Sequence, residues 1–138
     1  MDAHVKDVVR EMTAASCEER IGFPDVVKAL AEAGVERYHA DLVAGAKTYF
    51  MPDGDLEATP TKDAFVPALT FCAERVEAAV RAIQRGEIQY REFCRRIADA
   101  GCAGYFVSLV GRRAVYYGRT GDSYVEWFPG AGPAERRR

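Results

Sequence analysis

The sequence contains one stretch of 33 residues twice, at a constant offset of 67 positions and without a gap. Residues 23–55 and 90–122 carry the same amino acid at nine aligned positions, where average composition would give roughly two. The identical pairs are Ala31/Ala98, Ala33/Ala100, Gly34/Gly101, Tyr38/Tyr105, Leu42/Leu109, Val43/Val110, Tyr49/Tyr116, Gly54/Gly121 and Asp55/Asp122. Two copies are too few for a repeat array, which needs about three units to bury a continuous core. The repeat therefore predicts a duplicated unit within one domain, residues 1–130, followed by a disordered tail over 131–138.

Within each copy a helical period of apolar residues is followed by a strand period. The spacing predicts helices over 23–33 and 90–100, each ended by a glycine in the left-handed conformation, Gly34 or Gly101. After each glycine an alternating pattern predicts a β-hairpin closed by a two-residue turn. A helix–hairpin unit is therefore expected twice, with the two units related by an approximate two-fold axis.

Three further elements are expected outside these units. Apolar spacing predicts an amphipathic helix over 2–15 and a long helix around 63–85 that joins the copies. A third strand is expected over 124–128, after the second copy only. The predicted fold class is α+β, with a mostly antiparallel sheet and the helices packed on one side of it.

The chain is close to neutral. Apolar residues make up 49% and charged residues 29% of its 138 positions, which is ordinary for a soluble globular protein. The net charge of −2 gives no long-range field to attract nucleic acid or an anionic membrane. No apolar run approaches the ~20 residues of a membrane span, and the polar N-terminus lacks the apolar core of a signal peptide. We therefore expect a cytoplasmic protein that binds neither nucleic acid nor membrane.

The cysteines and the known site signatures give little sign of a metal or cofactor. Cys17, Cys72, Cys94 and Cys102 stand far apart, with no C-x-x-C pair, which argues against a disulfide framework and a structural zinc site. We expect them to be reduced and mostly buried. The common signatures of nucleotide, hydrolase and zinc-protease sites are also absent. No metal and no cofactor are therefore expected.

Comparison of the two copies singles out His39 and Asp41. With a two-residue turn, both share a hairpin face that is largely apolar in the second copy, where Phe106 and Ser108 take their places. One interpretation is a catalytic acid–base or metal-ligating pair, because a carboxylate beside an imidazole raises its pKa and fixes its tautomer. The other is a solvent-exposed face, on which Asp41 lies opposite Thr48 and His39 lies against Phe50.

Four repeated tyrosines form a second candidate site. Tyr38, Tyr49, Tyr105 and Tyr116 share the hairpin faces that also carry leucines, so they are expected to point inward. Related by a pseudo-two-fold axis, they would line a ligand-binding cleft with apolar walls and polar hydroxyl groups. In the alternative, the hydroxyl groups bond to the backbone or reach the sheet edge and no cavity exists.

Several motifs resemble one known family. They are Phe23-Pro24-x-Val26-Val27, Arg37-Tyr38-His39-x-Asp41, Gln84-x-Gly86-x-Ile88-x-Tyr90 and Gly118-Arg119-x-Gly121-Asp122. Over about residues 20–130 the chain resembles the YbcV-like family of uncharacterised bacterial proteins, some of which carry the label "phage envelope protein". The family is a domain of unknown function, so the resemblance implies no mechanism and no catalytic residue.

Three functions remain open at the level of sequence. The first is a small binding module that takes a small molecule or a partner protein, with a homodimer possible, through its pseudo-two-fold sheet or cleft. The second is an enzyme that uses His39 and Asp41. The third is a phage-derived structural or accessory protein, which a broad exposed apolar patch would favour.

Overall fold

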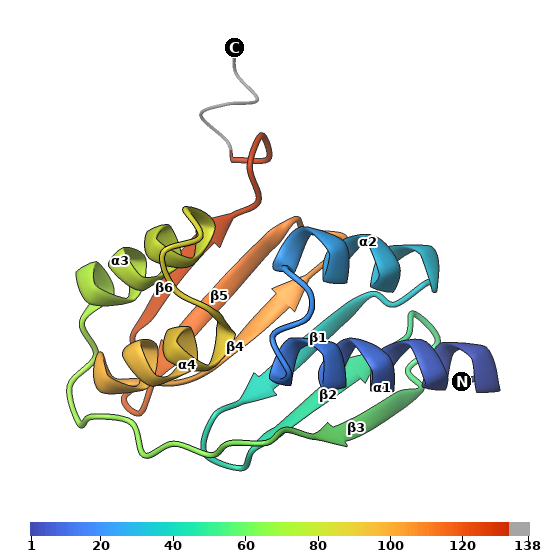
Figure 1. Ribbon diagram of the computed structural model, residues 1–138, viewed down its shortest axis with the longest axis horizontal. Helices are drawn as coiled ribbons and strands as arrows, with labels where there is room; N and C mark the ends of the chain where they lie inside the picture. The colour runs from blue at the N-terminus through green and yellow to red at the C-terminus, as the bar shows by residue number, and fades with distance from the viewer. Residues whose placement is uncertain (133–138) are drawn as a thin grey trace.

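The computed structural model describes residues 1–132 of the chain, as four helices and one six-stranded sheet (Figure 1). The first half of the chain supplies two helices and three strands, and the second half repeats this order. The elements are α1 (Ala3–Cys17), α2 (Phe23–Glu32), β1 (Arg37–Asp41), β2 (Ala46–Phe50), β3 (Leu56–Pro60), α3 (Ala73–Gln84), α4 (Tyr90–Asp99), β4 (Cys102–Ser108), β5 (Arg113–Gly118) and β6 (Ser123–Trp127). The predicted α+β class is confirmed.

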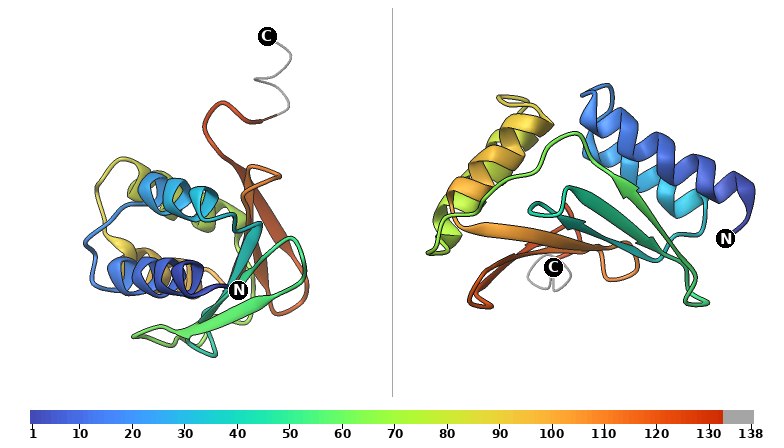
Figure 2. Two further views of the ribbon diagram at one scale, coloured as in Figure 1. Left: turned by 90° about the vertical axis from the view of Figure 1, so that its right-hand side faces the viewer. Right: turned by 90° about the horizontal axis from the view of Figure 1, so that it is seen from below.

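The sheet and the helices form two layers. All strand pairs are antiparallel, in the order β3-β2-β1-β4-β5-β6. The helices cover one face of the sheet, as predicted, with α1 and α2 over the first half and α3 and α4 over the second (Figure 2). On the opposite face, here called the open face, residues 1–132 place no helix. Within residues 1–132, no helix has both the length and the apolar character that a membrane crossing requires.

The structure extends the duplication beyond the 33-residue repeat. At the same offset of 67, β3 (56–60) falls on β6 (123–127), and α1 (3–17) overlaps α3 (73–84). The central strands β1 and β4 pair with His39 opposite Phe106, and these two residues are themselves 67 positions apart. The pseudo-two-fold axis therefore passes between His39 and Phe106.

Backbone hydrogen bonds beside the central strands repeat this symmetry. The amide of Leu42 donates to Ala103 O at 3.1 Å, and the amide of Leu109 donates to Glu36 O at 3.0 Å. Adding 67 to the donor position of the first bond, and subtracting 67 from its acceptor position, gives the donor and the acceptor of the second bond. The two bonds are therefore equivalent under the repeat. The two units are thus joined edge to edge through their first strands.

The core lies between the helices and the inner face of the sheet. The four repeated tyrosines lie on this face, and their exposed fractions range from 1% to 8%. Facing them are apolar helix residues with no exposed surface, Val9, Leu30, Val76 and Ile97. Each such aliphatic side chain contributes roughly 1.5–3 kcal/mol on burial. The predicted inward orientation of the tyrosines is confirmed.

The two glycine stops adopt the predicted backbone conformation. Gly34 and Gly101 have φ angles of 85° and 94°, in the region that favours glycine because it has no Cβ. Each follows the last turn of its helix and turns the chain toward the first strand of its unit. The helix–glycine–strand prediction is confirmed in both copies.

The predicted helix around 63–85 is wrong before residue 73. The helix α3 begins only at Ala73, and residues 61–72, here called the strap, are not helical. The strap amides bond to other elements instead of to the preceding turn: Phe65 N donates to Leu42 O and Cys72 N to Ala100 O, both at 2.8 Å. Leu69, which the apolar stripe placed toward the core, is 76% exposed. Tertiary hydrogen bonds therefore outweigh the helical period, and Pro67 within the strap also disfavours helix.

Two hairpin details also differ from the prediction. Asp41 pairs with Ala46, so the turn is a four-residue loop over 42–45 and not a two-residue turn. His39 consequently lies opposite Thr48 and not against Phe50. Because the register differs by two residues, an even number, every side chain keeps its predicted face.

The ends of the two units need two further corrections. The first copy also has a third strand, β3, which the sequence predicted only for the second copy. Of the predicted tail over 131–138, Ala131 is 1% exposed and therefore packed, and residues 133–138 lie outside the described part of the chain.

Candidate functional site

His39 lies at the centre of the open face of the sheet. Its ring stacks on Phe106 at 4.4 Å between ring centres, and its Nε2 lies 2.7 Å from the hydroxyl oxygen of Tyr117. Tyr117 reaches across β4 because Gly104 stands between them, where a Cβ would collide with the Tyr117 hydroxyl group. The half-buried imidazole has a pKa below its usual range because of desolvation, which the charge of Asp41 opposes.

Asp41 does not form a pair with His39. Its Oδ1 accepts hydrogen bonds from the amides of Val43 and Ala44, both at 3.0 Å, and so closes the loop that follows β1. In the described chain, three or more metal-ligating side chains do not gather anywhere. The partner of His39 is therefore Tyr117, which the sequence comparison had not connected to it, and a catalytic role of His39 and Asp41 stays a prediction.

The four repeated tyrosines pack against one another. Ring centres are 5.3 Å apart for Tyr38 and Tyr49, 6.5 Å for Tyr38 and Tyr105, and 5.2 Å for Tyr105 and Tyr116. The rings therefore form a continuous row across the inner face, and their role as ligand-binding residues stays a prediction.

Two of the tyrosine hydroxyl groups have partners within the core. That of Tyr49 lies 2.8 Å from the Thr13 hydroxyl, and that of Tyr105 lies 2.8 Å from the Tyr90 hydroxyl. Such bonds satisfy a buried hydroxyl without a ligand.

Lys47 is a buried charge that the sequence comparison missed. It lies on β2 and points into the core, and only 3% of its surface is exposed. Its Nζ lies 4.5 Å from the ring centre of Tyr90 and 5.8 Å from that of Tyr38. Within residues 1–132 its ammonium group makes no hydrogen bond and no ion pair. Lysine is almost never buried in this way unless it is paired.

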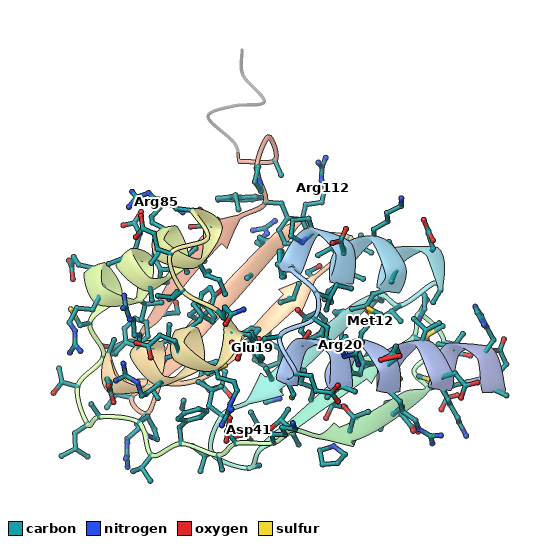
Figure 3. All side chains as sticks on the ribbon, in the orientation of Figure 1. Met12, Glu19, Arg20, Asp41, Arg85 and Arg112 are labelled. Atoms are coloured by element: carbon teal, nitrogen blue, oxygen red, sulfur yellow. The ribbon has the colours of Figure 1, made fainter. Side chains whose placement is uncertain are left out.

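A small cavity adjoins Lys47. Its volume is about 20 Å³, which is room for one or two water molecules. The end of α1, the loop after β1, the strap and the first turn of α4 enclose it, and Cys17, Cys94 and Tyr90 line it beside Lys47. Figure 3 labels Glu19 just past the end of α1 and Asp41 at the end of β1, on the side of the molecule where α1 meets α4.

Burial determines the electrostatics of this cavity. Desolvation lowers the pKa of Lys47 below its usual range, while the nearby thiols of Cys94 and Cys17 act in the opposite direction. Desolvation also raises the pKa of the Cys94 thiol to about 11, even though Lys47 is close. The thiol is therefore protonated at neutral pH, and the ammonium group of Lys47 has no thiolate to balance it.

The rim of the cavity carries a second cation. Arg91, in the first turn of α4, forms an ion pair with Asp63 of the strap, with 2.8 Å between Nε and Oδ2. The two side chains are 56% and 33% exposed, so the pair lies at the solvent side of the cavity. Lys47 and Arg91 thus give the cavity a cation at its inner end and another at its opening.

The repeat itself contained the signal for Lys47. At the offset of 67 its counterpart is Ala114, so one copy has a cation where the other has a methyl group. Strand alternation also places Lys47 on the same face as Tyr49, two positions later. A polar residue that is unique to one copy and points inward is a stronger candidate than one that points outward, such as His39.

The cysteines agree with the sequence prediction where the structure tests it. All four are free, with Cys17, Cys94 and Cys102 buried and Cys72 partly exposed. Cys102 donates to the carbonyl of Gly104 at 3.1 Å.

The chain matches the model of a family described as "Protein of unknown function (DUF1398)" over residues 12–126. It belongs to this family. It is also similar to "Uncharacterized protein Mb2035" of Mycobacterium bovis and "Uncharacterized protein Rv2012" of Mycobacterium tuberculosis. Each is 29% identical to it over 115 residues, which is 82% of this chain and 70% of the relative. The chain thus contains a DUF1398 domain. The names of the family and of these relatives state no role for this domain.

Proposed function

We propose that this DUF1398 protein is a small-molecule binding module whose ligand occupies the Lys47 cavity. The observation that carries the proposal is that Lys47, only 3% exposed, lines this cavity and that its ammonium group has no ion pair or hydrogen bond in the described chain. A buried charge without a partner costs folding free energy, and a ligand that supplied the partner would offset this cost. The setting that we propose is the cytoplasm, in keeping with four free cysteines.

The shape of the site supports a small ligand. The cavity has apolar and aromatic walls, a few polar groups and an opening beside Arg91 and Asp63, which is the usual composition of a small-molecule site. It lies to one side of the pseudo-two-fold axis, where the first turns of α4 in the second unit and residues of β1 and β2 in the first unit line the same cavity. The ligand would therefore contact residues of both units. It would bind at Lys47 and not at the equivalent position of the second unit.

A partner protein or a second copy of the chain is the second candidate, and the open face of the sheet supports it. Phe106, beside the rings of His39 and Tyr117, is 44% exposed there, and Val125 on β6 is 40% exposed. The same face would serve a phage-derived structural or accessory protein, as the resemblance to YbcV-like proteins suggests, or an enzyme that uses His39.

An NMR screen separates these candidates. The backbone amide spectrum of the chain would be recorded with each member of a metabolite library. We expect ligands to shift the amide signals of Lys47, Tyr90 and Cys94, around the cavity, and to leave those of Phe106 and Tyr117 unchanged. Shifts confined to Phe106 and Tyr117 would refute the proposal and favour the open face. A library with no ligand that shifts the cavity signals would also count against it.

A further inference from the structure

We infer that the Lys47 cavity holds the carboxylate group of a small monocarboxylate, with the remainder of the molecule directed toward Arg91 at the rim. This inference rests on the proposed function and specifies the chemical class of its ligand. Three observations support it: the cation of the cavity that has no ion pair among the described residues, the end of a helix beside the cavity, and the size of the cavity.

One of the two cations that line the cavity has no ion pair within residues 1–132. Four charged side chains line the cavity: Lys47, Arg91, Asp41 and Asp63. Asp63 is paired with Arg91, and Asp41 accepts the loop amides that follow β1. Lys47 alone among these four has neither an ion pair nor a hydrogen bond at its charged group in the described chain. A ligand with a single negative charge would give the ammonium group of Lys47 the ion pair that it lacks there.

The N-terminal end of α4 adds a second feature that favours an anion. The ten-residue helix begins at Tyr90, and its N-cap residue, Gln89, forms no side-chain cap. Unbonded amides and the helix dipole make such an end attractive to negative charge. The carboxylate of Glu19 already lies 3.5 Å from the amide nitrogen of Arg91, so a carboxylate of the chain itself approaches this helix end.

Size favours a carboxylate over a larger anion. A cavity of about 20 Å³ corresponds to one or two water molecules, which is close to the size of a planar carboxylate group. A phosphate or sulfate has four oxygen atoms, is bulkier and carries more negative charge than one ammonium group balances. The remainder of the ligand would pass the exposed Arg91–Asp63 pair on the solvent side of the cavity.

Calorimetry on the full chain tests the inference with matched pairs of compounds. Sodium acetate and sodium propionate would be titrated beside acetamide and propionamide, which have nearly the same shape without the charge, and beside sodium phosphate. We expect each carboxylate to bind at least about 10-fold more tightly than its amide, because a hydrogen bond to a charged group contributes about 1.5–3 kcal/mol. Phosphate is expected to bind more weakly than acetate.

Three variants assign the effect to residues. Lys47→Met should weaken carboxylate binding at least about 10-fold, because it removes the charge and keeps the length of the side chain. Arg91→Gln should weaken it by roughly two- to fivefold, as expected for an exposed charge. Lys28→Met is the matched control, because Lys28 is an exposed lysine on α2, and it should leave the affinity unchanged.

Two results would overturn the inference. One is equal binding of a carboxylate and its amide, or tighter binding of phosphate. The other is unchanged carboxylate affinity in Lys47→Met. If amides or phosphate still shifted the amide signals of the cavity, the proposed function would survive without the carboxylate. If no compound shifted them, both would fail.

Discussion

Lys47 is a buried ammonium group without an anion, and a charge in that position costs folding free energy. Cation–π contacts with the rings of Tyr90 and Tyr38 offset part of this free-energy cost. Its counterpart in the second unit is Ala114, so the fold itself does not need a cation at this position. At the scale of single residues, Lys47 is therefore the side chain that stability alone explains least.

Lys47→Met is expected to raise the free energy of unfolding by about 1–3 kcal/mol at pH 7, because it removes an unpaired buried charge and keeps a similar volume. Chemical denaturation of the wild type and the variant measures the difference. A variant less stable than the wild type would show that Lys47 has a structural role.

The stability difference should also depend on pH. Burial lowers the pKa of Lys47 in the folded chain, whereas an unfolded lysine has a pKa of about 10.4. Below both values Lys47 is protonated in both states, and its full cost is present. As pH rises from the folded pKa toward about 10.4, the folded chain releases its proton first, so the wild type gains stability relative to Lys47→Met. Because the wild type and the variant contain the same buried thiols and tyrosines, the titration of these groups cancels in the difference between their free energies of unfolding.

His39→Phe tests the enzyme alternative. The change places in the first unit the residue that the second unit has at Phe106, keeps the stack between them and removes the bond to Tyr117. Because the site is half-buried, we expect the free energy of unfolding to change by less than about 1 kcal/mol. Ligand affinity at the Lys47 cavity should not change, since His39 lies on the other face of the sheet. Loss of a measured activity in a stable variant would instead support a catalytic His39.

At the scale of elements, the strap makes the two units differ. The two helix–glycine–strand junctions have the same backbone, but the strap crosses only the second. A Cβ on Gly101 would collide with the carbonyl oxygen of Thr70 and lie 2.7 Å from the Cα of Phe71, both in the strap. A Cβ on Gly34 would meet only the end of Met51, at 3.7 Å. The two glycines therefore meet the same conformational requirement under different steric conditions.

We expect Gly34→Ala to lower the free energy of unfolding by about 1 kcal/mol, the cost of an alanine at positive φ. Gly101→Ala should lower it by about 3 kcal/mol or more, because the strap must also move. Thermal and chemical denaturation of the two variants gives the comparison. Equal losses of unfolding free energy in the two variants would show that the strap moves away from residue 101 without a measurable cost.

At the scale of the whole molecule, the two units depend on each other through β1 and β4. Each unit alone would leave one of these strands with an unpaired edge. The pseudo-two-fold axis at His39 and Phe106 means that the edge of β1 has nearly the hydrogen-bonding pattern of the edge of β4. A second copy of one unit can therefore take the place of the other.

A fragment of residues 67–132, which contains α3, α4 and β4 to β6, is expected to fold as a symmetric dimer with Phe106 opposite Phe106 of its partner. Sedimentation equilibrium with circular dichroism measures assembly and folding together, and folding should increase with concentration. A folded monomer would show that the unit does not need a paired central edge. A fragment unfolded at every concentration would show that the unlike unit is required.

The sequence by itself determined the elements that local patterns specify. The repeat, the helical and strand periods and the two glycine stops follow from neighbouring residues, because backbone sterics and side-chain alternation act over a few positions. The same alternation placed the tyrosines inside and His39 outside, even with the turn length wrong by two residues.

Only the tertiary structure decided the strap and the candidate site. The apolar spacing of residues 61–72 fits a helix, but their amides bond to Leu42, Ala98 and Ala100, which lie far away in the sequence. Strand alternation puts Lys47 on the same face as Tyr49, but whether a buried cation has a partner depends on where Asp63, Arg91 and the first turn of α4 come to lie. Those positions follow from the packing of one unit against the other, and no local sequence pattern specifies this packing.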